Sequence, residues 1–426
     1  MQLPASLSTC PKPQLEELLI TLQQQYQSHC DAQLALDLTR GKPSANQLDL
    51  SDALDGILDG NYCAADGTDC RNYGGLHGLP ELRELGAKLL GTAPEQIIAG
   101  GSSSLTLMYF TLLFAKLFGL AGAPAWQQRG NPKILCPVPG YDRHFAICER
   151  LGIEMVCVAM NNDGPDMDAV EALLAEEKDI VGMWNVPKYS NPTGITYSDA
   201  VVKRIAKLGQ LAEPGFLVLW DNAYAVHDIA AVSDPLTAIA PLAAAAGTEV
   251  AQFASTSKIT HAGAGVSFMA GSSALIASVV EQLGIAMIGP DKINQLRHVA
   301  LLKEGGLNTL MAGHKALLAP RFAAVEEALT EHFTNSELLS WTRPNGGYFV
   351  SVDTLPGIAS RVVALAAAAG VKLTPAGATF PYNRDPQDRN IRLAPSFPSL
   401  DDVVNTMRVF CCCVQLASVE QQLANG

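Results

Sequence analysis

Lys258 is the residue whose surroundings most favour covalent chemistry. It lies in the run FASTSKIT, just after a predicted strand at 250–255, with Gly263 and Gly265 close behind it. A lysine amine attacks a carbonyl carbon only when it is neutral, so such a lysine depends on a lowered pKa. Taken alone, the fragment also fits a surface lysine that follows a strand.

Two further groups of polar residues follow predicted strands. Asp221 ends the apolar run at 216–220, and the sequence NPTG at 191–194 follows a predicted strand at 180–186. Open α/β sheets bind ligands at the carboxyl ends of their parallel strands. Tyr224 is close enough to Asp221 to share one cavity with it. As alternatives, the aspartate caps a helix and NPTG is an ordinary turn.

A glycine- and serine-rich segment precedes the most apolar helix of the chain. It reads GGSSS at 100–104. Free backbone N–H groups, hydroxyls and the positive end of a helix dipole together suit a phosphate. Ordinary capping of the helix by a serine explains the same residues.

The elements that must position these residues alternate between strands and helices from about residue 95. This alternation predicts an α/β fold with a mostly parallel sheet covered on both faces. After about residue 290 the pattern indicates a smaller α+β domain, joined by the N-terminal segment. We therefore expect a large domain at 50–295 and a small one formed by 1–49 and 296–426.

Segment 37–46 is expected to be a loop. The other predicted strands lie at 133–137, 154–159, 216–221, 266–270, 347–352 and 390–393, and the predicted helices at 13–29, 102–118, 167–176, 198–212, 307–332, 359–370 and from 400 onward.

The composition is that of a large protein with a well-buried core. The 426 residues are 48% hydrophobic and 17% charged, with a formal net charge of −13. This charge argues against a nucleic-acid or anionic-membrane partner, because such partners require a basic face. The apolar stretch at 105–123 contains Lys116, which favours a core helix over a membrane span. The ten cysteines form no CxxC pair, so reduced thiols of a cytoplasmic protein are expected, with no metal site.

The order and spacing of these pieces resemble fold-type I pyridoxal 5′-phosphate (PLP) enzymes, and specifically the class I/II aminotransferases, over nearly the whole chain. Local sequence at 141–145 and 257–265 is most similar to a bacterial aspartate-aminotransferase-like branch. The resemblance implies a large domain with a seven-stranded type of sheet between helices and a smaller α+β domain. The matching pieces are YGGLHG at 73–78, GSS at 101–103, PVPGY at 137–141, NPTG at 191–194, DNAY at 221–224, STSK at 255–258, NGGYF at 345–349 and Arg392.

The resemblance implies roles for five residues around the coenzyme ring. Lys258 would form a Schiff base with PLP and then act as the general base. Asp221 would pair with the protonated ring nitrogen, which keeps the ring able to accept electrons. Asn191 and Tyr224 would hydrogen-bond the ring oxygen O3′, and Tyr141 would stack on the ring face. In some members a histidine also stands behind the aspartate, at the place of His144 here.

The same resemblance assigns the phosphate to Gly101, Ser102, Ser103 and Ser255, with Tyr73 reaching it from a neighbouring subunit. The active unit would then be a homodimer with its site at the subunit interface. Most relatives also have a phosphate-binding arginine seven or eight residues after the lysine, where this chain has Gly265 and Val266. Thr260, Ser257 or a basic residue from elsewhere is expected to compensate.

Arg392, with Asn191 beside it, would bind the α-carboxylate of the substrate, a role suited to a bidentate guanidinium. Gly41 matches the glycine of a loop that closes over the substrate. The implied reaction moves an amino group between an amino acid, aspartate or glutamate, and a 2-oxo acid. A dicarboxylic substrate needs a second cation, for which the candidates are Arg143, Lys292 and Arg297.

Two other functions remain open at this point. One is a different reaction on the same scaffold, such as a lyase or a decarboxylase, because the bond that breaks depends on how the substrate lies over the ring. The other is a non-catalytic, aminotransferase-like sensing module. Only about 40 residues precede the match and they contain no basic cluster, so a fused DNA-binding domain does not fit.

Overall fold

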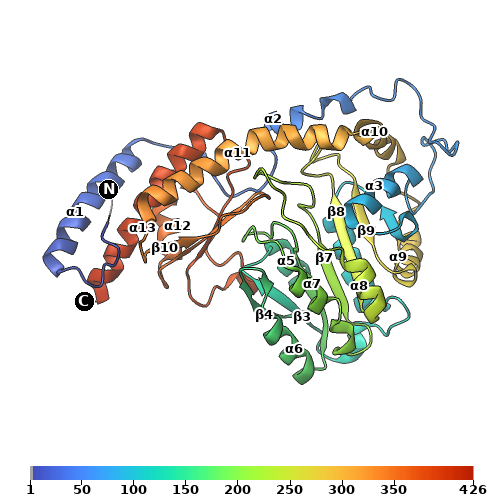
Figure 1. Cartoon of the computed structure of the whole chain (residues 1–426), viewed down its shortest axis with the longest axis horizontal. Coiled ribbons are helices and arrows are strands. Elements are labelled where there is room, and N and C mark those ends of the chain that lie inside the picture. Colours follow the sequence, from blue (N-terminus) through green and yellow to red (C-terminus); the bar gives the residue numbers. More distant parts are fainter. Residues whose placement is uncertain (1–2, 426) are drawn as a thin grey trace.

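An eight-stranded sheet forms the centre of the larger part of the molecule, at the right of Figure 1. The structure is a computed structural model that describes residues 3–425. Strands β8, β7, β6, β3 and β4 are parallel, whereas β9 is antiparallel to β8 and β2, and β5 is antiparallel to β4. The strands are β2 (Ile97–Ala99), β3 (Lys133–Val138), β4 (Glu154–Asn161), β5 (Gly164–Pro165), β6 (Ile180–Asn185), β7 (Leu217–Asp221), β8 (Glu249–Ser255) and β9 (Ser267–Ala270).

Helices cover both faces of this sheet, and every residue of the central strands β6 and β7 is buried. Strands buried on both faces are continuous apolar runs, which is why these two stand out in the sequence. Alternate residues of β7 belong to two separate cores, with Leu219 in one and Trp220 in the other. The first core includes α4 (Ser104–Leu117), α5 (Asp142–Leu151) and α9 (Ser273–Ala286), and the second includes α6 (Met167–Glu176), α7 (Asp199–Ile205) and α8 (Ile239–Ala246).

Helices α3 (Pro80–Leu90) and α10 (Lys292–Leu302) pack near the β2–β9 edge of the sheet. From there the long helix α11 (Gly306–Phe333) leads into the smaller part of the molecule (Figure 1). The short helix α2 (Ala45–Asp49) packs against α11.

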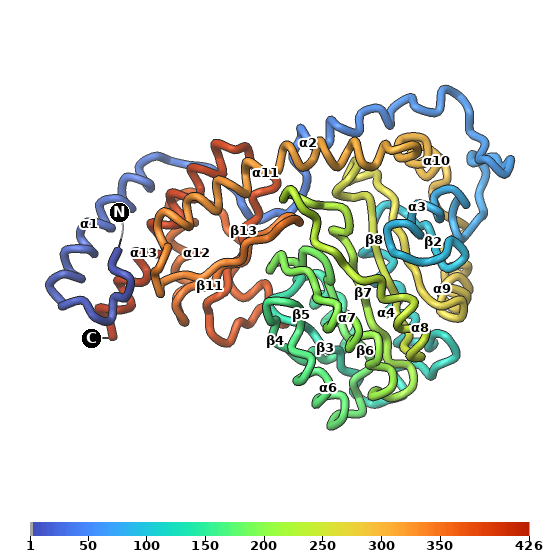
Figure 2. Tube along the Cα trace, in the orientation of Figure 1, coloured from blue at the N-terminus to red at the C-terminus, as the bar shows by residue number. Residues whose placement is uncertain are grey.

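The smaller part contains a three-stranded antiparallel sheet in the order β10-β11-β13. Helix α1 packs beside α13 although the two are far apart in the sequence, as the blue and red tubes of Figure 2 show. The domain boundaries at 49/50 and 295/296 stay a prediction. The elements are α1 (Lys12–Asp31), β10 (Leu339–Trp341), β11 (Val350–Thr354), α12 (Ala359–Ala368), β13 (Asn390–Leu393), α13 (Leu400–Asn425) and the parallel pair β1 (Leu36–Asp37) and β12 (Val371–Lys372).

Helix α13 is the one helix within residues 3–425 that is long and apolar enough to cross a membrane, and 78% of its most apolar stretch is buried inside the protein. It packs against α1, α11 and α12, so it serves as the core helix of the smaller part. The run Cys411–Cys413 lies in this core, and all ten cysteines are unpaired.

The predicted α/β fold is confirmed, although the large sheet has eight strands and not seven, and three of the predicted segments differ in extent. The strand expected at 347–352 begins only at Val350, because the Gly347 N–H donates to the His227 carbonyl (2.9 Å) in a turn. The helix expected at 198–212 ends at Ile205. The loop expected at 37–46 contributes Asp37 to β1 and enters α2 at Ala45.

Candidate active site

One cavity brings together seven of the twelve residues that the resemblance assigns to the coenzyme or the substrate. It lies at the carboxyl ends of β7 and β8, on the face of the sheet where α4 and α5 begin. The seven are Ser103, Tyr141, Asn191, Asp221, Tyr224, Ser255 and Lys258, and Ser104, Leu105, Met108, Val186, Ala223 and Ser257 complete the wall. The other five of these twelve lie outside this wall: Tyr73, Gly101, Ser102, Gly41 and Arg392.

Lys258 follows β8 in a tight turn, in which the Ile259 N–H donates to the Thr256 carbonyl (2.8 Å). Its Nζ lies 4.9 Å from the centre of the Tyr224 ring. Burial lowers the pKa of the Lys258 ammonium below the ordinary lysine value, while the nearby Asp221 carboxylate acts in the opposite direction. The turn therefore presents an amine whose neutral, nucleophilic form is favoured.

Asp221, at the end of β7, is a buried carboxylate with one oxygen bound and one oxygen free. Its Oδ2 accepts a hydrogen bond from His144 Nε2 (3.0 Å), and its Oδ1 is buried with no hydrogen-bond partner in the structure. The His144 ring is fixed by stacking on Trp184, with ring centres 3.9 Å apart. An acceptor oxygen without a partner is costly to bury, so this oxygen is suited to a donor from a bound molecule.

Tyr224 and Tyr141 supply hydroxyls at the same cavity. Burial raises the pKa of the Tyr224 phenol well above its ordinary value, with further contributions from Tyr141 and Asp221, so its O–H remains a donor. Burial likewise raises the pKa of Tyr141. Asn191 is 3% exposed and its Oδ1 accepts from Arg392 Nη1 (3.2 Å), which leaves its amide NH₂ for a ligand.

Hydroxyl groups and a helix start line the other end of the cavity. Ser103 caps α4, since its Oγ accepts from the Leu105 N–H (3.2 Å). Ser255 Oγ donates to Ser257 Oγ (3.1 Å), which in turn donates to the Ser102 carbonyl (3.1 Å). Gly101 is exposed and faces open space.

Thr260, one of the residues expected to compensate for the missing arginine, does not reach this end of the cavity. It is fully buried, and its hydroxyl is bonded to the Thr256 carbonyl (3.2 Å) and to His298 Nε2 (2.9 Å). That expectation is wrong for Thr260, whereas Ser257 does line the cavity.

Arg392, on β13, is buried beside the cavity and is joined to Gly41 through one aromatic ring. Its guanidinium carbon lies 4.8 Å from the centre of the Phe349 ring. Gly41 lies so close to the Phe349 ring that a Cβ at this position would overlap the ring. The loop that carries Gly41 therefore packs over Arg392 by way of Phe349, and this packing requires a glycine.

Tyr73 lies away from the cavity of its own chain, and 80% of its surface is exposed. The loop that carries it is held by Lys292, whose Nζ donates to the Gly74 carbonyl (2.7 Å). Lys292 is thus engaged next to Tyr73, whereas Arg143 and Arg297 are exposed. Within residues 3–425, these contacts do not identify which cation would bind the side-chain carboxylate of a dicarboxylic substrate.

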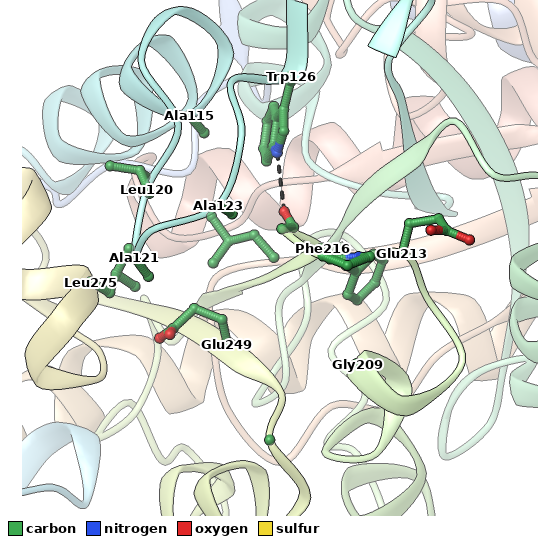
Figure 3. Close-up of a pocket in the computed structure, with 14 residues that line it drawn as sticks. Ala115, Leu120, Ala121, Ala123, Trp126, Gly209, Glu213, Phe216, Glu249 and Leu275 are labelled. Atoms are coloured by element: carbon green, nitrogen blue, oxygen red, sulfur yellow. Dashed lines mark hydrogen bonds between the residues drawn. The ribbon is translucent and has the colours of Figure 1, made fainter. Parts of the chain in front are cut away.

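A second cavity lies at the amino ends of β7 and β8, far from Lys258 along those strands (Figure 3). Its wall is mainly apolar, and the Trp126 indole donates to the Gly215 carbonyl (3.1 Å). Burial raises the pKa of Glu249 in this wall, but its carboxylate is already bonded to the Ser272 hydroxyl (2.8 Å). Of these two cavities, the one at Lys258 is where several polar side chains converge.

Two residues beside the site were not found from the sequence. His227 Nε2 lies 3.3 Å from the Lys258 carbonyl, and Asp142 Oδ1 lies 2.9 Å from Arg392 Nη1. The only sequence signal for His227 is its place three residues after Tyr224, and Asp142 is separated from Arg392 by 250 residues.

The residues present fit PLP. The buried Asp221 Oδ1 without a partner suits the N–H of a protonated pyridine ring, and the hydroxyls at the start of α4 suit a phosphate. The Lys258 amine, with its lowered pKa, suits an aldehyde.

The family described as aspartate amino-transferase matches residues 11–425 of this chain. An aspartate aminotransferase of Corynebacterium glutamicum is 46% identical over 392 residues, which cover 91% of this chain and 90% of that protein.

Solved structures give the same result. The crystal structure of an aspartate transaminase from C. glutamicum superposes with a TM-score of 0.94 at 43% identity, covering 98% of this chain and 99% of that one. An α-aminoadipate aminotransferase of Thermus thermophilus, complexed with N-(5′-phosphopyridoxyl)-L-leucine, superposes with a TM-score of 0.74 over 96% of each chain. At 21% identity, that likeness shows the shared fold alone.

Proposed function

This chain belongs to the aspartate aminotransferase family and is an aminotransferase, and on this basis we propose that its amino donors are aspartate and glutamate, its acceptor a 2-oxo acid, and its coenzyme PLP. The observation that carries the proposal is the pairing, in one cavity, of a lysine whose pKa is lowered by burial with a buried carboxylate oxygen that has no partner. The family implies PLP, and the C. glutamicum relative suggests the dicarboxylic substrate.

When bound, PLP supplies an aldehyde that carries the amino group and a cationic ring that withdraws electrons from the substrate Cα. Lys258 would hold the aldehyde carbon between turnovers. Once the substrate amine has displaced Lys258, the neutral Nζ would take the proton from the substrate Cα. It would then deliver that proton to the carbon on the other side of the transferred nitrogen. Asp221, oriented by His144, would keep the ring nitrogen protonated.

Neutral donors would orient the ring and bind the phosphate. Asn191 and Tyr224 would hydrogen-bond the ring oxygen, and Tyr141 would cover one ring face. The phosphate would lie against the start of α4 and the hydroxyls of Ser103, Ser255 and Ser257, with Gly101 and Ser102 at its open side.

Arg392, with Asn191 beside it, would bind the α-carboxylate, and the loop at Gly41 would cover it through Phe349. For the second carboxylate of the substrate, Arg143, Lys292 and Arg297 remain the candidates.

We also infer a cytoplasmic homodimer. Tyr73 is exposed, lies on the loop held by Lys292 and does not line the cavity of its own chain, which supports a role at the phosphate of another chain. Exposed Ile285 and Ile288 precede α10 near this loop, where Gly289 packs directly on Gly74. These side chains would be covered in the dimer.

The test is a half-reaction with PLP-loaded protein and no 2-oxo acid. L-aspartate should remove the absorbance of the protein-bound aldehyde and release oxaloacetate in an amount equal to the number of active sites. Lys258→Ala is the control, and it should release no oxaloacetate. An unchanged spectrum with both aspartate and glutamate would show the dicarboxylic assignment to be wrong.

A further inference from the structure

Arg392, the proposed carboxylate ligand, is already paired with a carboxylate of its own chain. Its Nη1 lies 2.9 Å from Oδ1 of Asp142, the first residue of α5. The Arg392 side chain is 8% exposed and that of Asp142 is 35% exposed, so a buried cation is neutralised by an acid at the edge of the site.

The contacts of the guanidinium are confined to one side. Nη1 donates to both Asp142 Oδ1 and Asn191 Oδ1 (3.2 Å), whereas Nε is buried and has no hydrogen-bond partner among residues 3–425. A carboxylate binds arginine best through two parallel hydrogen bonds along one edge. The edge that includes Nε therefore has no hydrogen-bond partner of its own, and it is the edge available to a substrate carboxylate while Asp142 keeps its bond to Nη1.

We propose that Asp142 sets the affinity of the site for substrate carboxylates by offsetting the charge of Arg392. This inference rests on the proposed function, in which Arg392 binds the α-carboxylate. A substrate carboxylate bound at the Nε edge would share one guanidinium with Asp142, and the like charges would repel each other. Asp142 thereby weakens the binding of amino acid and 2-oxo acid alike, and lets each leave after its half-reaction.

A purely structural role for Asp142 makes a different prediction. Acidic residues in the first turn stabilise helices, and Asp142 has that position in α5. In that case its replacement would lower the unfolding temperature and leave carboxylate affinity unchanged. Binding of a carboxylate that cannot react separates the two roles.

The experiment measures the dissociation constant of succinate from PLP-loaded protein by titration of the coenzyme absorbance, together with KM and kcat for aspartate. Asp142→Asn keeps an oxygen acceptor for Nη1 and removes the charge. Its succinate dissociation constant and aspartate KM should fall about tenfold, a modest change because solvent screens the partly exposed acid. Asp142→Glu should restore the parent values.

Two further variants keep the result interpretable. Asp142→Ser also removes the charge and suits a helix start, so it replaces Asp142→Asn if that variant does not fold. Asp168→Asn is the matched control, because Asp168 is an acid in the first turn of α6 that pairs with Arg204 (2.6 Å), away from the site. It should bind succinate as the parent does.

Arg392→Gln separates this inference from the proposed function. If Arg392→Gln weakens succinate binding but neither charge-removing variant at 142 strengthens it, the inference about Asp142 is overturned and the proposed function stands. If Arg392→Gln leaves succinate binding unchanged, the carboxylate role of Arg392 is wrong, and the inference is overturned with it.

Discussion

His227 provides a test of how strongly burial beside the site disfavours a protonated imidazole. It is buried between the Tyr224 and Tyr348 rings, and its Nε2 lies 3.3 Å from the Lys258 carbonyl. A carbonyl only accepts, so Nε2 carries the proton, and Nδ1 is buried with no hydrogen-bond partner in the described part of the chain. Burial, with a smaller contribution from the Lys258 ammonium, lowers the pKa of His227 from 6.5 to about 3.

A lowered histidine pKa makes the folded state less stable in acid. Above pH 6.5 His227 is neutral in both states and adds no pH dependence. Below that pH the unfolded chain binds a proton at this position and the folded chain does not, so stability is lost as the pH falls toward about 3. At about pH 5, some 1.5 units below the unfolded value, the loss is about 2 kcal/mol at about 1.4 kcal/mol per unit.

The assay compares thermal unfolding of coenzyme-free parent and His227→Gln at about pH 7.5 and about pH 5. For a chain of this length unfolding as a unit, about 2 kcal/mol corresponds to about 2 °C, so the midpoint of the parent should fall about 2 °C further than that of the variant. Gln keeps an N–H that can reach the Lys258 carbonyl and does not titrate. His332→Gln, in the last turn of α11, is the control and should behave as the parent. The reasoning is refuted if His227→Gln loses as much stability in acid as the parent.

Two predictions concern the approaches to the site. Gly41→Val should raise KM for the amino donor about tenfold or more, because the valine side chain overlaps the Phe349 ring that covers Arg392. Steady-state kinetics would measure this change, and an unchanged KM would contradict the packing. Tyr73→Ala should retain PLP poorly, and mixing it with Lys258→Ala should form hybrids in which an intact Lys258 meets an intact Tyr73 of the other chain. Transaminase activity that merely adds in the mixture would contradict a cross-subunit role.

The central strands could be predicted because burial on both faces leaves a continuous apolar run. β6 and β7 are such runs, and β13 was found at its observed bounds, Asn390–Leu393. The short strands could not be predicted, since β2 and β10 span three residues each and β5 only two. Segments so short carry no periodicity, and only their pairing partners define them as strands.

The residues around Lys258 could be predicted because they follow recognisable strands and turns, which bring Asp221, Tyr224 and Asn191 to one cavity. The contacts that tune them could not be predicted. Asp142 meets Arg392 across 250 residues, and nothing local in either segment indicates the pairing. Thr260 is the opposite case. It is close to the lysine in sequence, but its hydroxyl is turned into the protein interior and away from the cavity.

The contact between α1 and α13 has a consequence for synthesis of the protein on the ribosome. Cys412 Sγ lies against the Leu22 carbonyl, 390 residues away, and the Tyr26 hydroxyl bonds to the Leu365 carbonyl (2.9 Å). Most of the stability of a helix in a protein comes from tertiary packing of its apolar face, and the partners of α1 are at the other end of the chain. Helix α1 therefore emerges long before any surface that could hold it, and a chaperone that shields apolar segments has its longest opportunity to act there.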